Sequence, residues 1–218
     1  MKKLIFGAVL MSSLVSAQAA DFALGTNIGT PGVGVQATVG LFDSINVRGV
    51  VNFFSTDFDE NQDGVEYDLD LDLQSAGVIL DWHPGAGAFR FSAGAFSNGN
   101  EITGAGRSQP GTFIEFGDEV FAAEDLGTVN ANFDFDSVAP YLGIGWGNAA
   151  QNEGWSFSAD IGVYLQGEPK VTLSTPDVDP SIVDLVAAEL AQAEANLEDE
   201  VDNLDFYPYL SIGVAYRF

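Results

Sequence analysis

The chain contains no cysteine, one histidine and very little positive charge. Without cysteine it can form no disulfide and cannot carry the lipid of a lipoprotein. Seven Lys and Arg residues stand against 32 Asp and Glu, giving a formal net charge of −25. A nucleic-acid partner is thereby excluded, because phosphate binding needs a basic surface. One histidine is too few for a zinc cluster, and no phosphate-binding loop is present. We therefore expect no enzyme, no cofactor and no metal site.

Apolar residues make up 46% of the chain and are regularly spaced, which argues against disorder driven by charge. The N-terminus has the features of a secretory signal peptide: basic Met1–Lys3, apolar Leu4–Leu14 and small residues at Ala17–Ala19. The apolar stretch is too short to cross a membrane as a helix. We expect residues 1–19 to be removed and residues 20–218 to form a single domain.

The last run of the chain alternates apolar residues with small or polar ones, as a strand with one apolar face does. The apolar positions are Leu210, Ile212, Val214, Tyr216 and Phe218. This ending resembles that of the bacterial outer-membrane β-barrels, whose last strand ends in phenylalanine. The resemblance implies an outer-membrane location, contact with outer-membrane lipid, and an assembly signal in these five residues for the barrel-assembly machinery.

Turn signals divide residues 22–218 into eight runs, each of which reaches the ~9–11 residues that a tilted membrane strand needs, the first only just. The runs are Phe22–Thr30, Val33–Phe42, Ile45–Phe58, Val65–His83, Ala88–Ile102, Thr128–Trp146, Trp155–Thr175 and Leu204–Phe218. An even number puts both ends in the periplasm, with mostly longer loops outside. The sequence thus predicts an all-β fold, an eight-stranded antiparallel up-and-down transmembrane β-barrel. The pattern is similar to that of the OmpA-type and OmpX-type small barrels, without the peptidoglycan-binding domain, and we expect a monomer.

Alternation within each run assigns apolar side chains to lipid and polar ones to the lumen. The charged residues expected in the lumen are Arg48, Asp81, Arg90, Asp160 and Arg217. Because a buried guanidinium needs a partner, Asp81 is expected between Arg48 and Arg90. The cluster either simply fills a narrow barrel or lines a gated polar path. Eight strands enclose little more than their own side chains, which favours the first interpretation.

The outer halves of the fourth and sixth runs carry acids on the side that faces lipid further down. Asp72 is ten residues from Trp82, and Asp136 is ten from Trp146, a distance of one membrane crossing. We therefore expect both runs to project beyond the bilayer, where the acids meet water. The inward residues of an apolar upper lumen would then be Leu69, Leu71, Leu73, Phe133 and Phe135. A β-bulge that reverses the alternation and turns the acids inward is the open alternative.

The insertion before the last run is predicted to be an amphipathic helix over about 180–204. Asp179 suits the capping position and Pro180 the first helical position. The apolar stripe recurs at steps of three or four residues: Ile182, Val186, Leu190, Ala193, Leu197, Val201 and Leu204. We expect this helix, in the last extracellular loop, to cap the barrel mouth against Leu69, Leu71, Phe133 or Phe135.

Two further features admit a chemical interpretation. Asp57–Gly64 places oxygen ligands at alternate positions, as a calcium loop does, but Gln62 stands where such a loop needs glycine. A solvated hairpin loop is the alternative. His83 is expected at the membrane interface beside Trp82, whereas outer-membrane enzymes of this architecture generally place a histidine at the outer face. The predicted function is therefore a non-enzymatic structural or surface-interaction role, the alternative being a narrow channel or uptake barrel for small solutes, apolar ones included.

Overall fold

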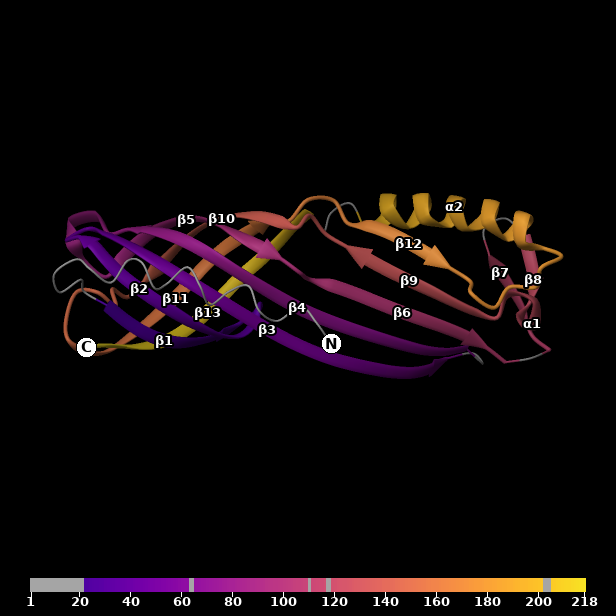
Figure 1. The fold of residues 1–218 in the computed structure, drawn as a ribbon, viewed down its shortest axis with the longest axis horizontal. Helices are drawn as coiled ribbons and strands as arrows, with labels where there is room; N and C mark the ends of the chain where they lie inside the picture. The colour runs from indigo at the N-terminus through magenta and orange to yellow at the C-terminus, as the bar shows by residue number, and fades with distance from the viewer. Residues whose placement is uncertain (1–21, 63–64, 110, 117–118, 202–204) are drawn as a thin grey trace.

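The computed structural model describes residues 22–62, 65–109, 111–116, 119–201 and 205–218. The expected signal peptide, residues 1–19, lies outside the described residues. Most of the described chain is strand, arranged along one long axis with the single long helix beside it (Figure 1).

Eight strands close into an antiparallel ring in which each strand is hydrogen-bonded to two neighbours (Figure 1). In order around the ring they are β1 (Phe22–Gly29), β2 (Gly32–Phe42), β3 (Ile45–Gln62), β4 (Val65–Trp82), β5 (Phe89–Asn98), β10 (Val138–Trp146), β11 (Gly154–Leu165) and β13 (Phe206–Arg217). Pairing of β13 with β1 closes the ring. The predicted eight-stranded antiparallel barrel is confirmed. We call the end where β1 begins and β13 ends the terminal end, and the other the extended end.

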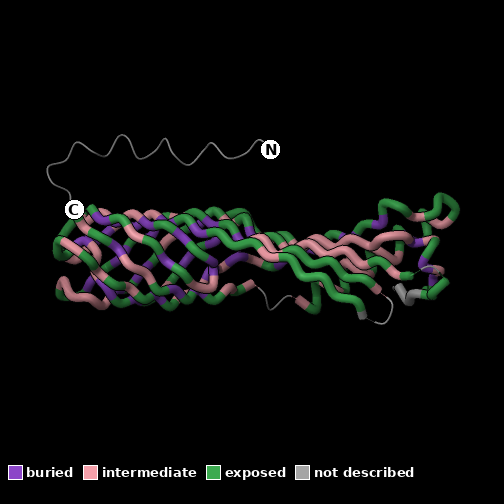
Figure 2. The backbone as a smooth tube through the Cα atoms, turned by 90° about the horizontal axis from the view of Figure 1, so that it is seen from below, coloured by how far each residue is buried: buried purple, intermediate pink, exposed green. Residues whose placement is uncertain are grey.

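Buried and exposed residues alternate along the strands of the ring (Figure 2). The exposed positions are largely apolar, so the ring is apolar on the outside and its buried residues lie inside, as alternation predicts. Outward side chains such as Val35, Val78 and Ile161 are exposed although they are apolar. Aromatic side chains gather outside the terminal end, where Trp82 stacks on Phe91 with ring centroids 5.6 Å apart. The ring is therefore built to meet an apolar solvent on its outer face.

Five strands form an open sheet that continues beyond the ring at the extended end. It consists of β12 (Lys170–Ser174), β9 (Thr128–Asp134), β6 (Glu101–Ser108) and the outer halves of β4 and β3, in that order. We call this sheet the extension. The ladder between β3 and β4 runs without a break from Ile45 to Val65, so alternation is not reversed. The acids of β4 therefore continue its outward face, and the β-bulge alternative is wrong.

At the extended end of the ring, Thr30 joins the turn between β1 and β2 to strand β13. The Thr30 hydroxyl donates to the carbonyl of Pro208 at 2.7 Å and accepts from the Leu210 amide at 3.0 Å. The Tyr207 hydroxyl donates to the Thr30 carbonyl at 2.6 Å. The turn between β1 and β2 is thus hydrogen-bonded to β13. The strands of the ring end early at this turn, whereas β3 and β4 continue beyond the ring.

The fifth, sixth and seventh predicted runs each comprise two strands. The interruptions fall at residues 99–100, 135–137 and 166–169, where the chain passes between ring and extension. Backbone bonds between the breaks keep them at one level: Asn98 donates to Ser137 at 2.9 Å, and Asp136 to Gln166 at 3.0 Å. A closed ring curves more tightly than an open sheet, and we attribute the interruptions to that change in curvature.

Two predicted loops are more ordered than expected. Residues 60–62, the start of the polar loop expected between the third and fourth runs, belong to β3, and residues 63–64 lie outside the described residues. The long loop expected after Ile102 contains the rest of β6, the hairpin of β7 (Phe113–Phe116) and β8 (Glu119–Ala122), and the short helix α1 (Ala123–Leu126). A single turn of 3₁₀ helix, η1 (Pro84–Ala86), connects β4 to β5 at the terminal end.

The long helix, α2, spans Val183–Glu200 and so begins three residues after the predicted start of the range 180–204; residues 202–204 of that range lie outside the described residues. Asp179 accepts hydrogen bonds from the Ser181 amide at 2.8 Å and the Ser181 hydroxyl at 2.6 Å, and so orders the turn before the helix. Within the described residues, no helix combines the length and apolar character that crossing a membrane requires.

The position of α2 differs from the prediction. It runs along β12 beyond the ring and does not cross the barrel mouth (Figure 1). The apolar stripe packs through the buried Val186 against Phe121 of β8 and Leu126 of α1. The prediction that the helix caps the mouth against β4 and β9 is therefore wrong, because the β7–β8 hairpin and α1 supply nearer apolar cover.

The polar side of α2 covers an edge of the extension. Glu194 accepts a hydrogen bond from the Leu173 amide at 2.7 Å, and Glu198 accepts one from the Val171 amide at 3.2 Å. Both amides belong to β12, the outermost strand on that side. Two carboxylates four residues apart on the helix thus satisfy backbone donors that would otherwise be open.

Candidate functional site

The lumen of the ring holds a buried quartet of charged side chains, which we call the charge quartet. Its members are Arg48 of β3, Asp81 of β4, Arg90 of β5 and Asp160 of β11. All four side chains are at most 4% exposed. Two positive and two negative charges make the group neutral, as burial in a narrow lumen requires.

Each arginine of the charge quartet contacts both carboxylates. Arg48 donates from Nε and Nη2 to Asp81 at 3.0 and 3.1 Å, and from Nη1 and Nη2 to Asp160 at 3.0 and 3.1 Å. Arg90 donates from Nη2 to Asp160 at 2.7 Å, and its Nε lies 3.6 Å from Asp81. Ser92 adds a hydroxyl bond to Asp81 at 2.6 Å. Both carboxylates therefore receive several charge-assisted bonds in fixed fork geometry.

The contact between Arg48 and Asp160 crosses the lumen. In the ring, β3 and β11 are separated by three strands on either side, so the two residues come from opposite walls. Asp81 lies between Arg48 and Arg90, the arrangement that the sequence suggests, and Asp160 bridges the same two arginines from the far wall. The charge quartet thus closes the lumen at its level.

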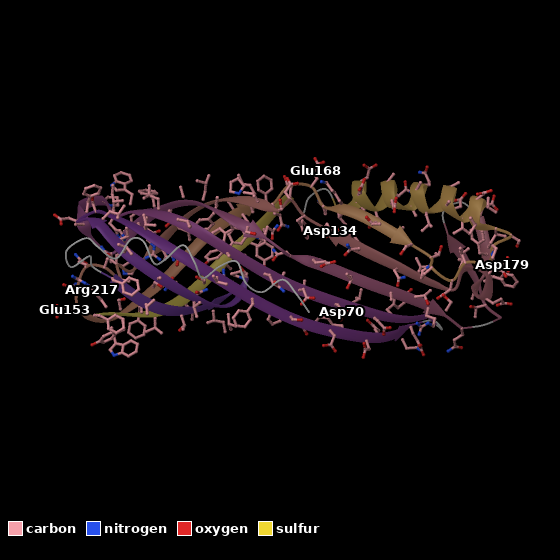
Figure 3. All side chains as sticks on the ribbon, in the orientation of Figure 1. Asp70, Asp134, Glu153, Glu168, Asp179 and Arg217 are labelled. Carbon is pink, nitrogen blue, oxygen red and sulfur yellow. The ribbon has the colours of Figure 1, made fainter. Side chains whose placement is uncertain are left out.

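The fifth predicted lumen charge, Arg217, lies elsewhere. Arg217 is opposite Gly154 in the ladder between β11 and β13, whereas Asp160 is opposite Ser211. Six residues of strand separate the two levels, roughly 20 Å at 3.3 Å per residue. Figure 3 shows Arg217 at the terminal end, near Glu153. Alternation assigns a face but not a level along the axis, so the sequence could not separate Arg217 from the others.

An aromatic layer lies next to the charge quartet on its extended side. It consists of Val50, Ile79, Phe96, Ala139, Tyr141, Tyr164 and Tyr209. The ring centroids of Phe96 and Tyr164 are 4.6 Å apart, and those of Tyr141 and Tyr209 are 5.1 Å apart. Six of the eight ring strands contribute to this layer. Alternation continued along β5, β10 and β13 places Phe96, Tyr141 and Tyr209 on the inward face, so the sequence does carry a signal for this layer.

Polar layers lie on both sides of these two. Toward the extended end, Asn27 donates to Asn52 at 2.7 Å, and Asn52 donates to Ser75 at 3.1 Å. Toward the terminal end, Asn46 lies 3.1 Å from His83 Nε2 and donates to Asn148 at 2.9 Å. The lumen is thus filled in successive layers, as in other narrow barrels.

His83 belongs to the polar layer at the terminal end. It is 1% exposed, and its Nδ1 lies 3.0 Å from the Gly87 carbonyl. Because a carbonyl only accepts, Nδ1 carries the proton and Nε2 accepts from Asn46. The expected interfacial position beside Trp82 is therefore wrong: Trp82 faces outward, and the next residue turns inward. Both ring nitrogens are engaged, which leaves neither to act on a substrate.

Little space remains beside the charge quartet. The cavity beside the charge quartet, lined among others by Arg48, Asp81 and His83, has a volume of about 20 Å³. That is room for about one water molecule. A solute of several heavy atoms cannot pass between these side chains as they stand.

Two solved structures align with most of this chain. The crystal structure of Acinetobacter baumannii CarO2 aligns with a TM-score of 0.57 at 18% identity, over 90% of this chain and 98% of that one. The structure of A. baumannii CarO aligns with a TM-score of 0.55 at 19% identity, over 90% and 97%. The fold is CarO-like. Neither a protein-family model nor a curated protein matches the sequence.

Outside the CarO-like ring, the extension carries an acidic face. Asp57 lies opposite Asp70, and Asp59 opposite Asp68, in the ladder between β3 and β4. An open hollow of about 340 Å³ lies on this face, lined among others by Asp68, Asp70 and Thr172. Figure 3 shows Asp70 and Asp134 along the extension.

The interpretation of Asp57–Gly64 as a calcium-binding loop does not agree with the fold. Residues up to Gln62 are strand, not the loop that such a site requires, and residues 63–64 lie outside the described residues. Among the residues that the structure describes, no three His, Cys, Asp or Glu side chains are grouped so as to hold a metal ion.

The predicted assembly-signal residues share the outer face of β13. Leu210, Ile212 and Phe218 are exposed on the CarO-like ring, Ile212 to 63%. They alternate with inward residues such as Ser211. The outward row is therefore a continuous apolar strip that ends at the terminal end.

Proposed function

We propose that this chain is a non-enzymatic outer-membrane protein with a structural or surface-interaction role, carried by the extension that the ring holds above the bilayer. The apolar outer face of the ring meets lipid, and the terminal end with its short turns lies in the periplasm. The acidic extension then stands in water outside the cell. The single observation that supports a role without transport is the filled lumen, crossed by the contact between Arg48 and Asp160.

The location follows from the solvent that each surface requires. Exposed apolar side chains cover the ring, and a soluble protein rarely exposes so large an apolar surface. The CarO-like fold and the outward row from Leu210 to Phe218 support the same location and assembly by the barrel-assembly machinery. Fractionation of cells and heat-modifiable migration on gels test it, and recovery as a soluble periplasmic protein would exclude it.

Planar-bilayer conductance tests the absence of transport. The purified full chain should give no stable single-channel steps, because a cavity of about 20 Å³ admits no ion with its hydration shell. Replacement of Arg48 and Asp160 together by alanine removes the contact that crosses the lumen and should produce or raise conductance. Stable steps in the parent protein would overturn the proposal in favour of a narrow channel.

The absence of catalysis rests on His83. It is the only histidine, it is buried, and both its nitrogens are engaged. We expect no hydrolysis of lipid or ester substrates by the purified protein. Hydrolysis that disappears in His83→Ala would refute this part of the proposal.

A further inference from the structure

The extension has two edges of different character. On one side, β12 is covered by α2, whose Glu194 and Glu198 accept from its amides. On the other side, β2 ends its pairing at Val33 opposite Phe53. Within the described residues, no strand pairs with residues 54–62 of β3 on the side away from β4. In Figure 1 this edge lies along the side of the extension opposite α2.

The backbone groups that are open at this edge can be identified. The carbonyl oxygens of Val51 and Phe53 point toward β2, because they lie beside Gly34 and Gly32 of that strand, respectively. Direction alternates along a strand, and the ladder with β4 is unbroken. The amides and carbonyls of Ser55, Asp57, Asp59 and Asn61 therefore point away from β4, to the open side.

The side chains at this edge define what fits there. On the acidic face, Asp57 and Asp59 each lie opposite another aspartate of β4. Like charges directly opposite one another are destabilising, and a neighbouring strand that carries basic residues would relieve the repulsion. On the other face, Phe54 and Phe58 are 43% and 58% exposed and offer an apolar surface.

We propose that residues 54–62 of β3 are a docking edge for an extended polypeptide segment of another protein, with basic residues on one face and apolar residues on the other. The segment adds a strand to the extension: its backbone pairs with Ser55, Asp57, Asp59 and Asn61. Its basic side chains lie over the acidic face and its apolar side chains on Phe54 and Phe58. A second copy of β3 is a poor occupant, because it would again place aspartates opposite aspartates. The inference rests on the surface role proposed above and names the class of partner.

The test uses the full chain folded in detergent and a fluorescent peptide of alternating lysine and valine, as long as residues 54–62. A control peptide has the same composition with its lysines grouped at one end. The alternating peptide should bind at least about threefold more tightly, because only it presents one basic and one apolar face. Equal binding of the two peptides, or no binding, would overturn the inference. Neither result bears on conductance or location, so the proposed function can stand or fall separately.

Matched variants separate the docking edge from general attraction to an acidic protein. Asp57→Asn combined with Asp59→Asn removes two charges at the edge, and Glu101→Gln combined with Asp134→Asn removes two from the inner strands of the extension. The first pair should weaken binding roughly three- to tenfold, the second by less than about twofold. Equal losses in both would refute docking at β3.

Amide hydrogen exchange tests the backbone pairing directly. Bound peptide should slow exchange about tenfold or more at Asp57 and Asp59, whose amides are open, and change little at Thr56 and Phe58, whose amides already pair with β4. Ser55→Pro removes an open amide without removing a charge and should also weaken binding, while the heat-modifiable band persists. If exchange at Asp57 and Asp59 slowed without peptide as the protein concentration was raised, two copies of the chain would be pairing at this edge. That result would refute a partner of another kind.

Discussion

Substitution of Asp160 by asparagine tests whether the charge quartet holds the ring together. The Asp160 carboxylate accepts three hydrogen bonds from two buried guanidinium groups, at 2.7, 3.0 and 3.1 Å. Asparagine has nearly the same shape but no charge, and its amide group would face donors. Removal of one partner from a buried ion pair costs about 3–5 kcal/mol, because the remaining charge stays buried. We therefore expect Asp160→Asn to lower the free energy of unfolding by about that amount.

The measurement is urea unfolding of the protein in lipid vesicles, followed by tryptophan fluorescence and by loss of the heat-modifiable band. Asp136→Asn, at an exposed aspartate between β9 and β10, is the matched control and should change stability by less than about 0.5 kcal/mol. If Asp160→Asn lowered the free energy of unfolding by less than about 1 kcal/mol, the charge quartet would not be a main source of the stability of the ring.

A double variant separates the interaction from the cost of an unpaired charge. Arg48→Met combined with Asp160→Leu leaves Arg90 with Asp81, a neutral pair, and replaces the other pair by apolar groups. Replacement of a whole buried pair is often close to neutral, so the double variant should cost clearly less than the sum of the single ones. Additive losses would contradict this account.

Three further outcomes follow from the same structure. Gly77→Val should destabilise the ring by about 1–3 kcal/mol in urea unfolding, because a Cβ there would collide with the buried ring of Phe96; an unchanged midpoint would contradict the packing of the aromatic layer. Glu194→Ala combined with Glu198→Ala removes the acceptors of two β12 amides and should speed amide exchange on β12 and protease cleavage of α2 while the ring stays folded; equal protection would show that these side chains do not hold the helix on β12. Hydrogen bonds from the hydroxyl and the amide of Ser181 lower the pKa of Asp179. The stability that Asp179 contributes to α2 is therefore present above the ordinary aspartate pKa and is lost as pH falls through the lowered value. Protection of α2 that weakens as the pH is raised would contradict this.

The sequence predicts the ring well because two solvents act on each strand. Lipid outside and a packed lumen inside impose strict alternation, which is visible in one strand without knowledge of its neighbours. The same reasoning places Arg48, Asp81, Arg90 and Asp160 in the lumen. It does not predict that Asp160 reaches Arg48, because that contact depends on which walls face one another in the closed ring.

Features that depend on remote contacts were not predictable in this way. The breaks near residues 99, 136 and 167 divide runs predicted as single strands, although Gly99, Gly167 and Pro169 are residue types that commonly interrupt a strand. The apolar stripe of α2 predicts that the helix is covered but not by what. Its partners Phe121 and Leu126 lie between the fifth and sixth predicted runs, in a segment expected to be a loop.

The extension links the membrane-facing ring to the proposed surface role. The strands β3 and β4 pass from a ring with an apolar outer face to a sheet with acids on the same face, so one pair of strands is matched to two solvents. At the base of that sheet, the buried contact between Arg48 and Asp160 joins opposite walls of the ring. Of the two edges of the extension, α2 covers β12, whereas the outer half of β3 remains open although acids flank it. An acidic edge resists pairing with its own copies and still accepts a basic strand, which is why the partner is to be sought among basic extended segments.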